Sequence, residues 1–85
     1  MNSKNDIWKD EQLRQLADVL ASISDPNEIR AFLRDVMTQK EIIEVGARLQ
    51  AAKMLSKGEK YADIIAATKL SSRTVARISD WMQNG

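Results

Sequence analysis

Residues 65–78 have the layout of a helix-turn-helix, and this stretch constrains the fold of the chain more than any other. Leu70 is placed to fill a short turn, and Ser71 is suited to cap the helix that follows it. The inward face of that second helix is then Val75 and Ile78. The spacing therefore predicts two helices that cross closely at a short turn.

The outward face of the second helix carries hydrogen-bond donors and no carboxylate as far as residue 79. Such a face suits a DNA groove lined by phosphates and by the acceptor atoms of base edges. Hydroxyl side chains lie near the expected helix start, and two arginines lie four residues apart on one face. The candidate DNA-binding residues of this helix are Ser71, Ser72, Arg73, Thr74 and Arg77. An ordinary helical hairpin with a polar outer face is the alternative interpretation.

Either arginine could make a bidentate contact with guanine or hold a phosphate. We expect Arg73 to be the base reader, because it lies nearer the helix start than Arg77. Tyr61 could donate its hydroxyl to a phosphate or pack half-buried against the domain, and the sequence leaves both open. The flanking residues expected to contact phosphates are Lys57, Lys60 and Lys69.

Apolar residues recur at helical spacing elsewhere, and no alternating β-branched run appears. The fold class is therefore all-α, with five to six short helices and the helix-turn-helix at the C-terminal end. Asp25 is a candidate N-cap, with Pro26 at the first helical position. Gly58 is suited to a left-handed helix end. Helices are expected at residues 6–23, from Pro26 through a buried face of Ile29, Phe32, Leu33 and Val36, from Thr38 to Gly58, at 61–68 and at 72–83.

The chain has 85 residues and contains neither cysteine nor histidine. A single domain of this size buries only about 60–65% of the surface that its unfolded form exposes, so its core is marginal. Disulfides and the usual zinc sites are excluded, which leaves oligomerisation as the available reinforcement. The commonest general base and the thiol nucleophile are also absent, so we expect no enzyme and no metal.

Charge is distributed unevenly along the chain. Residues 1–45 hold six Lys/Arg and nine Asp/Glu, whereas residues 46–85 hold seven Lys/Arg and three Asp/Glu. The positive half contains the helix-turn-helix pattern, as binding to nucleic acid would require. A solvated basic face is the alternative, and charge alone does not decide between them.

The first residues resemble no signal peptide, and no apolar run is long enough to span a membrane. We therefore expect a cytoplasmic protein that has no membrane partner.

Three stretches and the start of the last helix resemble the tryptophan repressor superfamily. They are residues 37–41 (MTQKE), 46–49 (GARL), 55–59 (LSKGE) and 74–77 (TVAR). The resemblance covers residues 36–79, about half of the chain. It is strongest to the short tryptophan-repressor-like proteins of unassigned function in Gram-positive bacteria.

The resemblance implies an all-helical, intertwined homodimer whose two reading helices enter successive major grooves of a palindromic operator. Residues 1–85 would form a single helical domain. Residues 1–58 would supply the dimerisation helices, and residues 59–85 would form the DNA-reading head.

In family members that bind tryptophan, the indole lies between two arginines. By position, Arg48 and Arg77 resemble those arginines, and Thr38 resembles a residue that helps to hold the ligand. The family has a glycine after the second arginine, where this chain has Ile78. We therefore expect at most a vestigial ligand pocket, with no cofactor, and neither L-tryptophan nor another small effector is favoured. The favoured alternative for Arg48 is an exposed residue on a long helix or part of an intersubunit ion pair.

The sequence thus favours a sequence-specific, double-stranded DNA-binding transcriptional regulator, a repressor that acts as a homodimer. The alternative is a helical, dimeric protein–protein interaction module that does not bind DNA.

Overall fold

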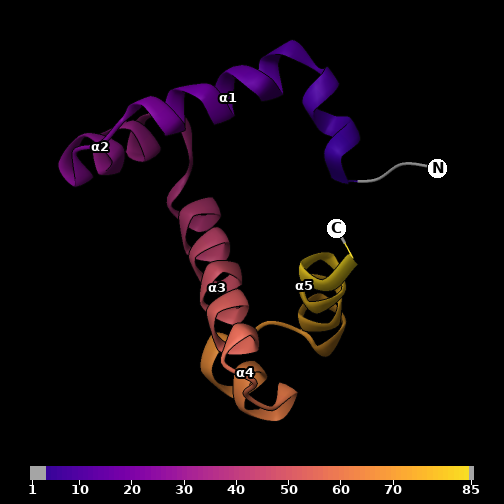
Figure 1. Cartoon of the computed structure of the whole chain (residues 1–85). Helices are drawn as coiled ribbons and strands as arrows, with labels where there is room; N and C mark the ends of the chain where they lie inside the picture. Colours follow the sequence, from indigo (N-terminus) through magenta and orange to yellow (C-terminus); the bar gives the residue numbers. More distant parts are fainter. Residues whose placement is uncertain (1–3, 85) are drawn as a thin grey trace. The chain divides into compact units, whose positions relative to one another are not determined.

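The computed structural model describes residues 4–84, and all regular elements among these residues are helical (Figure 1). This confirms the all-α fold class. The elements are a 3-10 helix η1 (Lys4–Lys9) and the helices α1 (Glu11–Ser22), α2 (Pro26–Val36), α3 (Gln39–Ser56), α4 (Tyr61–Thr68) and α5 (Ser72–Asn84). The chain divides into two compact units, residues 1–39 and residues 40–85.

The helix expected at residues 6–23 is interrupted, so the prediction of one continuous helix was wrong. Asp10 lies between η1 and α1 with extended backbone angles. Its carboxylate accepts a hydrogen bond of 2.8 Å from the backbone N–H of Gln12. An aspartate in this position satisfies an amide that the first turn of the helix leaves free, and α1 therefore begins at Glu11.

The second helix begins as the sequence predicted. Asp25 is the N-cap of α2, and its carboxylate accepts from the N–H of Asn27 at 3.0 Å. Pro26 occupies the first helical position, where its missing N–H costs no hydrogen bond.

Neither helix of the first unit buries its apolar face. No side chain of α1 or α2, both of which lie wholly within the described residues, is buried. Ile29, Phe32 and Leu33 are only half-buried, and Val36 is 54% exposed. The expected burial of this face was therefore wrong for the single chain, which leaves an amphipathic pair of helices with apolar surface in solvent.

The second unit has a small closed core where α3, α4 and α5 meet. Ala51, Ile64 and Val75 are fully buried, one from each helix. Met54 and Ile78 complete the buried cluster. Residues 39–50 of α3 contribute no buried side chain, and three of the apolar side chains among them are exposed: Ile43, Val45 and Leu49.

The end of α3 sets the direction in which the chain enters α4. Gly58 has a φ of 80°, as expected for a left-handed helix end. Its N–H donates to the carbonyl of Leu55 at 3.0 Å, and the N–H of Glu59 donates to the carbonyl of Met54 at 3.1 Å. These two bonds form the Schellman motif, which satisfies carbonyls that the last turn would otherwise leave free.

None of the helices within residues 4–84 combines the length and the apolar character needed to cross a bilayer.

The substitution Gly58→Ala should lower the free energy of unfolding by roughly 1 kcal/mol, because a Cβ disfavours the left-handed backbone at this position. Urea denaturation followed by circular dichroism measures the change. Gly46→Ala is the matched control: Gly46 lies inside α3, and a Cβ added there meets no atom within 4 Å. Equal stability of the Gly58→Ala protein and its parent would contradict this account of the turn.

Candidate nucleic-acid interface

Within the second unit, a three-residue turn, residues 69–71, joins the helices α4 and α5 (Figure 1). Leu70 in this turn packs against the core cluster, as the sequence predicted. On the far side of the turn, Val75 and Ile78 form the inward face of α5. The arrangement is two helices joined by a short turn, and the second helix is fixed by burial along one side.

The turn itself contains an unusual backbone conformation. Lys69 has a φ of 65° and is the one non-glycine residue with positive φ among residues 4–84. Its N–H donates to the carbonyl of Ile65 at 2.9 Å, which closes the last turn of α4. The left-handed geometry disfavours any residue with a Cβ, so a lysine here is held by the contacts on either side of it. The sequence predicted Lys69 only as a phosphate contact, and no signal in it indicated the left-handed conformation of the turn.

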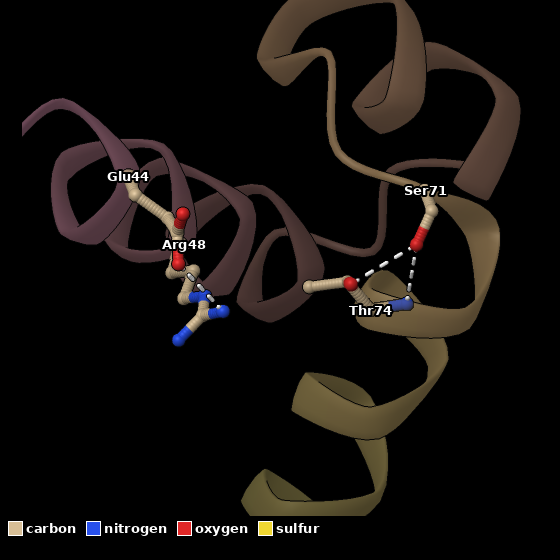
Figure 2. Close-up of polar contacts among 4 residues, drawn as sticks. All are labelled: Glu44, Arg48, Ser71 and Thr74. Carbon is tan, nitrogen blue, oxygen red and sulfur yellow. Dashed lines mark hydrogen bonds and ion pairs between the residues drawn. The ribbon is translucent and has the colours of Figure 1, made fainter. Parts of the chain in front are cut away.

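Ser71 caps α5. Its Oγ accepts a hydrogen bond of 3.1 Å from the backbone N–H of Thr74 and donates one of 3.0 Å to the Thr74 hydroxyl (Figure 2). The predicted cap is therefore present. The two hydroxyls are bonded to each other. The main role of Ser71 and Thr74 is therefore to form the helix start, and a contact with DNA is a secondary role.

The side chains that remain available on the outward face are those of Ser72, Arg73 and Arg77, all of which are exposed. Two of the five candidates thus serve the local fold, and three are open to a ligand. This division could not be made from the sequence, which placed all five on one face without showing which hydroxyls bond to each other.

The start of α5 also differs electrostatically from the other helix starts. Each of α1 to α4 carries an acidic residue in its first turn, whereas α5 carries none. The free amides and partial positive charge at a helix N-terminus attract anions, and here no carboxylate of the same turn competes for them. The start of α5 is therefore suited to approach a phosphate-lined groove.

The flanking lysines are all exposed. Lys60 precedes α4 as its N-cap residue, and its side chain makes no capping hydrogen bond. Lys57 lies in the turn that ends α3, and Lys69 lies in the turn between α4 and α5. Tyr61, at the first position of α4, is 42% exposed, so its ring is partly packed and partly open to solvent.

Two acidic side chains of this region lie among the flanking lysines in the sequence, and a third follows the two arginines. Asp63 is in the first turn of α4, and Glu59 precedes that helix. Asp80, the next acid after Arg77, accepts a hydrogen bond of 2.8 Å from the side-chain amide of Asn84. The acid-free segment predicted at the start of α5 is thus retained in the fold.

The residues considered for a tryptophan pocket have other surroundings here. Arg48 forms an ion pair with Glu44 one turn earlier on α3, with 3.0 Å between Nη2 and Oε2 and both side chains half exposed (Figure 2). Ile78 is buried in the core, and Arg77 is exposed on α5. Thr38 is exposed directly before α3.

A hollow of about 430 Å³ does occur in the second unit, at the end of α3 and beside α5. Its walls include Leu55, Glu59, Tyr61 and Met82, and none of the four expected pocket residues lines it. No group of acidic side chains within residues 4–84 is placed to hold a metal ion.

The chain is similar to known proteins over most of its length. The model of a family described as "Trp repressor protein" matches residues 11–85. A Bacillus subtilis (strain 168) protein described as "Uncharacterized protein YerC" is 31% identical over 80 residues, which are 94% of this chain and 77% of that protein. No solved structure matches the chain.

The substitution Ser71→Ala should lower the free energy of unfolding by about 1 kcal/mol, because it removes the cap of α5. Ser72→Ala is the matched control: it removes the neighbouring exposed hydroxyl and should leave stability within about 0.5 kcal/mol of the parent. Thermal or urea unfolding of the two variants gives the comparison. An equal loss in both, or no loss in Ser71→Ala, would show that the cap does not hold the helix start.

Proposed function

This chain belongs to the Trp repressor protein family, as its motifs predicted, and we propose that it is a sequence-specific DNA-binding repressor. The family is one of regulators rather than of enzymes. In the proposed mechanism, α5 enters the major groove with its first two turns, and the bound protein blocks access to the operator.

The observation that carries the proposal is the exposed outer face of α5. Ser72, Arg73 and Arg77 are exposed there, the first turn has no acid, and the opposite side of the helix is held by the core. Arginine can read guanine through two hydrogen bonds, and the rigid inward face would keep that geometry fixed. Arg73 is the proposed base reader, because it lies nearer the start of α5 than Arg77 does.

The three lysines of the two segments that connect α3, α4 and α5 would supply affinity without sequence preference. Lys57, Lys60 and Lys69 are exposed and lie in or beside segments that connect helices. Contacts of this kind go to phosphates and weaken steeply as salt rises.

A homodimer is the second part of the proposal. The helices α1 and α2 bury no side chain within the chain, and Ile43, Val45 and Leu49 on α3 are exposed. These exposed apolar faces, in a chain whose own core is small, favour association with a second copy of the chain. Two copies would present two reading helices, which matches a palindromic operator.

We propose that repression does not require tryptophan. Arg48 is engaged with Glu44, and the Ile78 side chain is part of the core. An arginine that pairs within its own helix and an isoleucine in the place of glycine both argue against a built indole site.

The same unburied faces favour one other function, that of a protein–protein interaction module. Residues 1–45 are acidic overall, and their apolar faces could bind a different protein. Such a module has no need for the acid-free basic face of α5, so retention on DNA at physiological salt separates the two functions.

The substitution Arg73→Ala should weaken binding to the preferred duplex by about 1–3 kcal/mol and relax sequence preference, because a base contact is lost. Fluorescence anisotropy at about 150 mM salt, with the preferred duplex and a scrambled one, measures both effects. Lys57→Ala should instead weaken both duplexes alike.

Arg73→Lys is the matched control for charge. Lysine keeps the positive charge but loses the planar fork of the guanidinium, so a base reader should lose preference in this variant too. If the Arg73→Lys protein keeps the full preference of the parent for its duplex, the side chain contacts a phosphate, and the assignment of Arg73 as the base reader is wrong.

Sedimentation should show a particle of about twice the 9.6 kDa chain mass, because the apolar faces need a partner. Ile43→Glu should shift the protein toward monomer, since it places a charge on an exposed apolar position. Gln50→Glu adds the same charge at an exposed polar position of α3 and should not. A monomeric parent at tens of micromolar would contradict the proposed assembly.

A further inference from the structure

Thr68, the last residue of α4, has a side chain in an unusual place. Among the residues whose side chains the structure describes, it is the one polar residue that is buried, at 9% exposure. Its Oγ1 donates a hydrogen bond of 2.8 Å to the carbonyl of Ile64 and accepts one of 3.3 Å from the backbone N–H of Leu70. One hydroxyl thus connects the last turn of α4 to the turn that follows it.

This connection spans the strained residue of the motif. Lys69, with its left-handed backbone, lies between the two ends that the hydroxyl joins. Leu70, whose N–H the hydroxyl accepts, also packs against the core that holds α5. The direction in which the chain enters α5 is therefore set by three features together: the hydroxyl bridge, the left-handed residue and the packed leucine.

A buried hydroxyl at this position is not needed for packing alone, since valine has nearly the same shape. Its role is to accept from the partly buried N–H of Leu70, which the turn removes from helical hydrogen bonding, because leaving such a donor without a protein acceptor costs free energy.

We infer that Thr68 is a positioning residue for sequence reading: its hydroxyl fixes the turn and so holds the start of α5 in the orientation that base contacts require. The inference rests on the proposed DNA-binding function. Base contacts need side chains placed within a fraction of an ångström, whereas phosphate contacts by long lysines tolerate a looser turn. Loss of the hydroxyl should therefore reduce sequence preference much more than it reduces general affinity for DNA.

The test compares Thr68→Val, which removes both hydrogen bonds, with Thr68→Ser, which keeps the hydroxyl. Each folded variant is titrated with the duplex that the parent protein prefers and with a scrambled duplex of equal length, at about 150 mM salt. Thr68→Val should lose about tenfold in affinity for the preferred duplex and less than about threefold for the scrambled one. Thr68→Ser should stay within about threefold of the parent on both.

A merely structural role would lower both affinities in proportion to the fraction of unfolded protein, and it would leave their ratio unchanged. Circular dichroism fixes that fraction before each titration. Should Thr68→Val fail to fold, Thr68→Ala carries the same comparison, because it removes the hydroxyl without placing a second methyl in the core.

The outcomes separate the inference from the function on which it rests. A parent that prefers one duplex, together with a Thr68→Val protein that keeps the same preference, overturns the role of Thr68 and leaves DNA reading intact. A parent with no preference between the duplexes overturns the proposed function and the role of Thr68 with it. The inference is supported if the ratio of the affinities for the preferred and the scrambled duplex falls in Thr68→Val or Thr68→Ala and stays at the parent's value in Thr68→Ser.

Discussion

The contact of Ala51, Ile64 and Val75, one fully buried residue from each of α3, α4 and α5, is the interaction on which the rest of the second unit depends. It holds α5 by one side and so determines which side chains face outward. Because the core is so small, each end of a helix needs its own local support, and the chain supplies it with Gly58, Thr68 and Ser71. The outer face of α5 is thus a consequence of packing on the opposite face.

Burial and charge divide the chain in the same way. The second unit buries a core and holds eight Lys/Arg against five Asp/Glu, whereas residues 1–39 hold five Lys/Arg against seven Asp/Glu, and α1 and α2 bury nothing on their own. The second unit therefore closes a core within the single chain, whereas the apolar faces of α1 and α2 stay exposed in it. The proposed dimer accounts for these exposed faces, and the proposed DNA contact accounts for the charge of the second unit.

The helical periodicity was enough to predict the fold class, the ends of α2, α4 and α5 within a residue or two, and the inward positions of Val75 and Ile78. It failed at Asp10, because the apolar stripe continued past a cap that only the local hydrogen bond reveals. It also failed at Val36, since a pattern shows which face is apolar but not whether the chain itself covers that face. The hydroxyl bonds of Thr68, Ser71 and Thr74 depend on rotamers, which spacing does not encode. For this reason the sequence predicted the outer face of α5 and the cap at Ser71, but not the turn bridge of Thr68 or the engagement of the Thr74 hydroxyl.

The central claim is that the outer face of α5 recognises a particular DNA sequence. Selection of genomic fragments by the purified protein at about 150 mM salt, with and without L-tryptophan, tests it most directly, since lower salt would let any basic surface retain DNA. The account predicts enrichment of one palindromic sequence that is unchanged by tryptophan. Recovery of fragments without any shared sequence would contradict it.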